Sequence, residues 1–155
     1  MSYAITGLDP APFRRLYGMS DAALAAEQAM RVTADSFPGF PCRVTLEDAA
    51  PGETLLLLNY EHLPVATPYR SRHAIFVREG AETPARFEDA IPEQLSSRLI
   101  SLRAFDGYGM MTNADVVEGS ALESLIEAML ADPAVAWLHA HNAKRGCFAA
   151  RIDRA

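Results

Sequence analysis

The sequence has few cysteines, no long apolar run and no excess of basic residues. Two cysteines in 155 residues exclude a disulfide scaffold, and their spacing provides no CxxC motif for a zinc ribbon or a thioredoxin-like site. The Leu55–Leu58 run, like every other apolar run of the chain, is far shorter than the roughly 20 residues of a membrane-spanning helix. Fourteen basic and twenty acidic residues give a net charge of -6, which argues against nucleic-acid binding. We therefore expect neither a membrane nor a nucleic acid as a partner.

The N-terminal segment, Met1–Gly7, has neither the basic region nor the apolar stretch of a signal peptide. We expect a soluble cytoplasmic protein in which Cys42 and Cys147 are reduced thiols. Hydrophobic residues make up 50% of the chain and charged residues 22%, which is typical of a globular protein. The length predicts a single domain over residues 1–155 and is compatible with a homodimer.

Three segments have helical patterns, at residues 21–31, 93–98 and 121–131. Ser20 is a suitable N-cap for the first, and Pro92 suits the start of the second. The third combines a capping box, Ser120-Ala121-Leu122-Glu123, with an apolar stripe at helical spacing. The stripe consists of Leu122, Leu125, Ile126, Met129 and Leu130.

Eight further segments have strand-like patterns. They are Tyr3–Leu8, Cys42–Thr45, Thr54–Tyr60, His73–Arg78, Leu99–Phe105, Met110–Val117, Val135–His141 and Cys147–Ile152. Several are joined by connections too short for a parallel crossover. We therefore predict an α+β domain with a mostly antiparallel or mixed sheet and about three helices packed on it.

The last two strands are predicted to form a hairpin around the turn residues 142–146. An odd-length loop would place His141 opposite Cys147, His139 opposite Ala149, and Trp137 opposite Arg151. One face would then be an apolar core face, with Leu138, Ala140, Phe148, Ala150 and Ile152. The other would carry Trp137, His139, His141, Cys147 and Arg151. We prefer the odd-length loop because a four-residue loop would mix these two sets.

The polar face of this hairpin is open to three interpretations. His139, His141 and Cys147 are residue types that bind zinc or another transition metal. The same residues could instead act as a Cys–His nucleophilic pair in catalysis. The third interpretation is a half-buried thiol, two surface histidines and a stack of Arg151 on Trp137. No carboxylate or fourth Cys or His lies nearby in sequence to complete a zinc site, and we expect no cofactor.

The segment 67–73 concentrates positive charge in an acidic protein. Arginine suits planar recognition of carboxylate or phosphate, so a small anion bound by Arg70 and His73 is one hypothesis. Further candidates for binding this ligand are Tyr69, Arg43 and Arg103. The alternative is a polar loop whose arginines pair with Glu47, Asp48 or Glu61. The chain has no GxGxxG, GxxxxGK[ST], HExxH or GxSxG motif.

Several short runs together resemble the bacterial family called domain of unknown function 1203, over about residues 40–154. The runs are Phe40–Arg43, Asp48, Pro51–Glu53, Leu55–Tyr60, Pro68–Arg70, Ile75–Arg78, Leu102–Asp106, His139–Asn142 and Gly146–Phe148. The resemblance implies a soluble bacterial single-domain protein and no assigned activity. The matching polar positions are Cys42, Arg43, Tyr69, Arg70, Arg103, Asp106, Asn142 and Cys147. Arg72-His73-Ala74 stands where a Gly-Pro pair is expected, so the resemblance implies no role for His73.

Two functional hypotheses follow. In the first, the 67–73 loop meets the hairpin face in a small-molecule site that either binds or catalyses. Arg70 and Arg103 would hold an anionic group, and His139, His141 or Cys147 would transfer protons or act as the nucleophile. In the second, the protein is a non-catalytic interaction or structural module, with Trp137 and Tyr69 on a partner surface.

Overall fold

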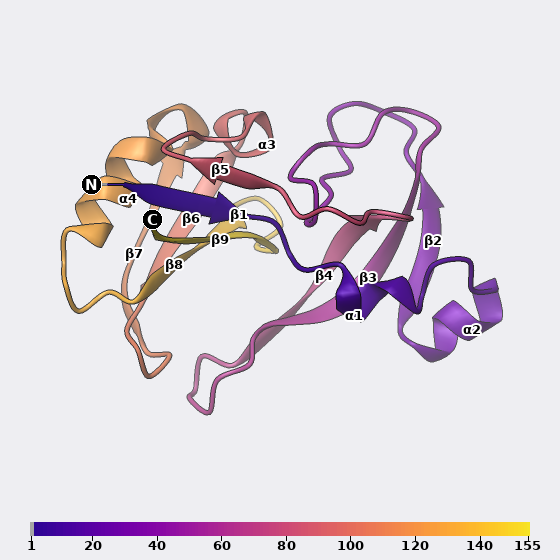
Figure 1. The fold of residues 1–155 in the computed structure, drawn as a ribbon, viewed down its shortest axis with the longest axis horizontal. Coiled ribbons are helices and arrows are strands. Elements are labelled where there is room, and N and C mark those ends of the chain that lie inside the picture. Colours follow the sequence, from indigo (N-terminus) through magenta and orange to yellow (C-terminus); the bar gives the residue numbers. More distant parts are fainter. Residues whose placement is uncertain (1) are drawn as a thin grey trace.

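Two antiparallel sheets make up most of the structure, a computed structural model that describes residues 2–155 (Figure 1). The elements, in chain order, are β1 (Tyr3–Thr6), α1 (Ala11–Arg14), α2 (Asp21–Ala26), β2 (Ala29–Thr33), β3 (Thr54–Leu63), β4 (Ser71–Arg78), β5 (Arg86–Glu88), α3 (Glu93–Ser96), β6 (Leu99–Phe105), β7 (Met111–Glu118), the 3-10 helix η1 (Gly119–Ala121), α4 (Leu122–Leu130), β8 (Trp137–Asn142) and β9 (Phe148–Arg154). The larger sheet has the order β5-β1-β9-β8-β6-β7, and the smaller has the order β2-β3-β4.

The larger sheet buries one face against α4. Leu122, Ile126 and Met129 of this helix belong to the same buried cluster as Ile100 of β6 and Leu138 of β8. Full burial of such a side chain contributes about 1.5–3 kcal/mol. The apolar stripe predicted for this helix is therefore confirmed as the contact surface between helix and sheet.

The smaller sheet has a core of its own, with α1 and α2 beside it at one end of the molecule in Figure 1. Leu56 of β3 and Ile75 of β4 are buried there with Phe13 of α1 and Leu24 of α2. Ser20 caps α2 by accepting a hydrogen bond from the backbone N–H of Ala23 at 3.2 Å, as the sequence predicted.

The antiparallel, sheet-rich architecture agrees with the predicted fold class, with two differences. Residues 2–155 form four α-helices rather than three, and these are short. Segment 42–45 makes a single isolated bridge, from Cys42 to Phe76, instead of a strand. Strands β2 and β5 were not predicted. None of the helices within residues 2–155 has the length and hydrophobicity that crossing a membrane would require.

Two predicted helices have different limits in the structure. The helix expected over 21–31 ends at Ala26, because Gln28 takes a left-handed backbone conformation (φ 56°) and Ala29 begins β2. The prediction of a capping box that starts at Ser120 is wrong. Ser120 lies within η1, the N-cap of α4 is Ala121 with no side-chain hydrogen bond, and the Glu123 carboxylate accepts a hydrogen bond from the Tyr3 hydroxyl at 3.1 Å instead.

Gly119 marks a close approach between η1 and the turn after α3. A Cβ atom there would lie 2.0 Å from the backbone oxygen of Leu95 and 2.7 Å from that of Arg98. We expect Gly119→Ala to lower the free energy of unfolding by about 1–3 kcal/mol, the usual cost of overpacking. Gly107→Ala is the control, because its Cβ meets nothing within 4 Å. Urea denaturation measures both, and equal effects would contradict this interpretation.

The C-terminal hairpin differs from its predicted register. The Asn142 N–H donates to the Cys147 carbonyl at 2.9 Å, so the loop has four residues, 143–146, and the odd-length prediction is wrong. His139 pairs with Arg151 and His141 with Phe148. A β-bulge at Ala149 supplies the extra residue, so most of the core face is preserved. Phe148 is the exception, since it packs against the histidines and not in the core beneath α4.

Candidate metal centre

All four histidines of the chain gather at one place, although they come from three strands. Ring nitrogens of His62, His139 and His141 lie within 4.8 Å of one another. The His73 ring stacks on His62, with centroids 4.6 Å apart and an interplanar angle of 14°. The cluster therefore joins the end of the smaller sheet to the face of the larger one.

Strand geometry explains how these side chains converge. His139 and His141 are two residues apart on β8, so both imidazoles project from the same face of the larger sheet. His62 lies near the end of β3, where the register with β4 shifts between Tyr60 and Leu63. A bulge of this kind re-aims the side chains beside it.

Phe148 of β9 closes the cluster with an apolar surface. Its ring stacks on His62 at a centroid distance of 5.1 Å and meets His139 edge-on at 5.0 Å. His62, His139 and His141 are all buried, and His141 has no exposed surface. The three imidazoles therefore lie in surroundings with little access to water.

Burial lowers the pKa of every histidine in the cluster. The pKa is about 4 for His62, about 3 for His139 and about 2 for His141, because the protonated ring is poorly solvated there. Burial also lowers the pKa of His73, and the positive charge of Arg103 acts in the same direction on all four rings. All four imidazoles are neutral at pH 7, which is the form that binds metal ions.

Hydrogen bonds fix the nitrogen that carries the lone pair in His141 and His73. His141 donates from Nδ1 to the Gly146 carbonyl at 2.9 Å, so its Nε2 holds a lone pair. His73 Nδ1 instead accepts from the Phe148 backbone N–H at 3.2 Å. Within residues 2–155, both ring nitrogens of His62, Nδ1 of His139 and Nε2 of His141 are buried and have no hydrogen-bond partner. An unsatisfied buried polar group costs about 1–3 kcal/mol, which a bound ligand would recover.

The three histidines fit a zinc-class ion after a small contraction. Zinc binds imidazole nitrogen at about 2.0–2.1 Å, and tetrahedral geometry then places two ligand nitrogens about 3.3 Å apart. Side-chain movements of about 1 Å would bring His62, His139 and His141 from their present separations to such a geometry. The carbonyl that orients His141 is a typical outer partner of a metal-binding histidine.

Cys147, expected beside the two hairpin histidines, is directed elsewhere. Its Sγ accepts hydrogen bonds from Arg43 Nη2 at 3.1 Å and from Asn142 Nδ2 at 3.7 Å, and it is not a member of the histidine group. Both cysteines are free thiols. The arrangement therefore replaces the predicted ligand Cys147 with His62.

Arg43 is a buried structural residue. Its guanidinium donates to the backbone carbonyls of Phe148 at 2.8 Å and Pro41 at 2.6 Å, and burial lowers its pKa. With its donors used in this way, Arg43 holds the loop before β3 against β9, and its charge helps to lower the pKa of His73.

The 67–73 loop contributes little to the cluster beyond His73. Arg70 pairs with Glu61 at 3.0 Å, as the polar-loop alternative expected, and Arg72 bonds the same carboxylate at 3.2 Å. Tyr69 meets Phe105 edge-on at 6.5 Å. The Arg151 guanidinium lies 4.8 Å from the centre of the Trp137 ring, which confirms the predicted stack.

His62 is the metal-binding candidate that the sequence analysis missed. Its strand was predicted to end at Tyr60, two residues too early to include it. The sequence contains only four histidines, and nothing in the spacing of His62 indicates that it joins the other three.

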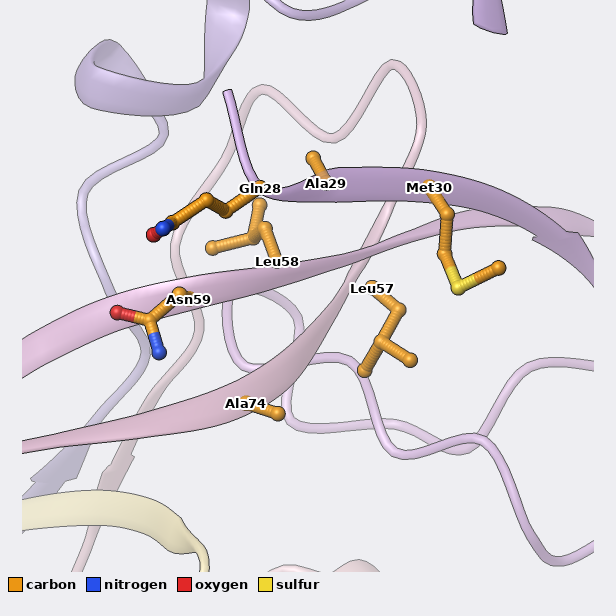
Figure 2. Close-up of a pocket in the computed structure, with 7 residues that line it drawn as sticks. All are labelled: Gln28, Ala29, Met30, Leu57, Leu58, Asn59 and Ala74. Carbon is orange, nitrogen blue, oxygen red and sulfur yellow. The ribbon is translucent and has the colours of Figure 1, made fainter. Parts of the chain in front are cut away.

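A hollow of about 470 Å³ lies against the strands β2, β3 and β4 of the smaller sheet (Figure 2). Its lining consists of Gln28, Ala29, Met30, Leu57, Leu58, Asn59 and Ala74. None of these seven side chains is ionisable.

No curated protein and no solved structure shows significant similarity to the chain. A family model matches residues 39–154 of the chain, a range that includes His62, His139 and His141. The chain belongs to the family described as "Protein of unknown function (DUF1203)".

Proposed function

We propose that this protein binds a zinc-class divalent metal ion through His62, His139 and His141 and uses it to activate a small ligand. The observation that carries the proposal is the convergence of three buried, neutral imidazoles whose lone pairs have no other partner in residues 2–155. Earlier expectations of no cofactor rested on a ligand set that lacked His62.

The number of protein ligands supports a reactive rather than a structural metal. Structural zinc sites are closed by four protein ligands, whereas three histidines leave one position for water or substrate. A metal of this class lowers the pKa of a bound water and polarises a bound oxygen, which suits hydrolysis or hydration. Phe148 supports such chemistry because its ring limits access of bulk water to the imidazoles.

The test is a zinc titration of the purified protein by calorimetry with two matched variants. His62→Phe keeps a flat ring between His73 and Phe148 but removes the ligand nitrogen. Loss of an outer-shell partner alone weakens metal affinity about 10–100-fold, so loss of this ligand should exceed about 100-fold. His73→Phe is the control and should change the affinity only slightly, because His73 stays outside the ligand group.

Stoichiometric zinc binding that is lost in His62→Phe and kept in His73→Phe supports the proposal. Equal affinity in all three proteins would overturn it. Failure of the wild-type protein to bind zinc, cobalt or nickel would favour the non-catalytic module. That alternative is supported by the aromatic packing of the cluster, in which the histidines would simply fill space between the sheets.

A further inference from the structure

Strand β6 places two polar side chains directly beside the proposed metal ligands. Arg103 pairs with His139, and Ser101 pairs with His141, in the antiparallel ladder between β6 and β8. Residues directly opposite in such a ladder project from the same face, with Cβ atoms about 4.5–5.5 Å apart. The face that carries His139 and His141 therefore also carries a guanidinium and a hydroxyl.

Arg103 differs from the other half-buried arginines of residues 2–155. Arg31, Arg78 and Arg98 each pair with a carboxylate. Arg103 makes a single hydrogen bond in the described structure, from Nε to Ser101 Oγ at 3.3 Å. Its Nη1 and Nη2 groups therefore have no partner within residues 2–155, and a guanidinium with such groups suits an anion.

The charges around the cluster point to the same ligand. Three neutral imidazoles would leave both positive charges of a divalent metal uncompensated. Arg103 adds a third positive charge beside the metal. Glu61 is the carboxylate whose negative charge affects the pKa of His62. It already forms ion pairs with Arg70 and Arg72. An anion in the open metal position would balance this excess in a region of low dielectric.

We infer that the open position of the metal binds a small oxyanion, a carboxylate or a phosphate group, which also accepts hydrogen bonds from Arg103. This inference rests on the proposed metal site and names the class of ligand that the site takes. The planar guanidinium matches the oxygen geometry of both groups, and Ser101 holds its Nε end in place.

The test measures binding of inorganic phosphate and of acetate by calorimetry to protein loaded with one equivalent of zinc, with no excess metal. Arg103→Met removes the charge and keeps much of the side-chain volume. We expect it to weaken anion binding about 10- to 100-fold, the usual effect of a lost charge-assisted hydrogen bond. Arg70→Met is the control and should leave anion binding unchanged, because Arg70 is committed to Glu61.

Zinc affinity, measured on the same proteins, separates failure of the two proposals. Arg103→Met should bind zinc at least as tightly as the wild type, since a nearby positive charge has been removed. Anion binding that needs zinc and depends on Arg103 supports the inference, and the preferred anion then identifies carboxylate or phosphate as the group recognised. If zinc binds normally but anion affinity is the same in Arg103→Met, or is lost in Arg70→Met, the inference is overturned while the metal site stands. If zinc does not bind, both fail.

Discussion

The free energy of unfolding of the metal-free protein should fall by about 6 kcal/mol between pH 8 and pH 5. An unfolded histidine binds a proton below its ordinary pKa of about 6.5. In the folded protein the pKa is about 4 for His62, about 3 for His139 and about 2 for His141. The unfolded state therefore binds more protons over this interval, and stability decreases as the pH falls. Each histidine contributes about 2 kcal/mol at pH 5, a large share of the roughly 5–15 kcal/mol typical of a domain.

Urea denaturation at a series of pH values, with a chelator present, measures this dependence. His62→Phe should reduce the loss between pH 8 and pH 5 by about 2 kcal/mol, since one of the three buried groups no longer titrates. Three carboxylates also have lowered pKa values, namely Glu27, Glu79 and Asp89. Their protonation lowers the free energy of unfolding nearer pH 4, below the interval measured here. A pH profile that is flat down to pH 5, or identical in the variant, would show that the histidines are not buried in neutral form.

Removal of the Arg43 side chain should have the second large effect. We expect Arg43→Met to lower the free energy of unfolding by about 3–5 kcal/mol, because the buried carbonyls of Phe148 and Pro41 lose their donors. The lost contact also links the loop before β3 to β9, across most of the sequence.

The matched control for this substitution is Arg145→Met. Arg145 is exposed in the 143–146 loop, and its replacement should change stability by less than about 0.5 kcal/mol. Urea midpoints of the wild type and both variants provide the comparison. A loss below about 1 kcal/mol in Arg43→Met would contradict the structural role of the buried guanidinium.

Alternation of side chains was enough to locate most of the strands but not all of their partners. Leu99–Phe105 was predicted with its observed limits, because apolar residues alternate along it and glycines follow it. Strand β2 was missed because an alanine-rich run precedes it and favours a helix, and only pairing with Leu55–Leu58 makes it a strand. Likewise, the capping role predicted for Glu123 is overridden by Tyr3, which is distant in sequence.

The candidate site shows where sequence reasoning ends. The spacing of His139 and His141 on one strand was enough to place both imidazoles on one face, and this part of the site was predicted. His62 could not be added, because its position depends on a bulge in β3 and on how the two sheets meet. The buried contacts of Arg43 could not be predicted for a similar reason. Its guanidinium donates to backbone carbonyls that only the folded chain brings near it.

The most direct test of the metal centre is a crystal structure of the zinc-loaded protein with anomalous diffraction measured at the zinc absorption edge. The account predicts one strong anomalous peak between the three imidazoles, about 2.0–2.1 Å from a ring nitrogen of His62, His139 and His141. It also predicts that a fourth position on the metal faces Arg103 and holds water or an oxyanion. An anomalous peak elsewhere on the protein, or no peak among these three rings, would contradict the account.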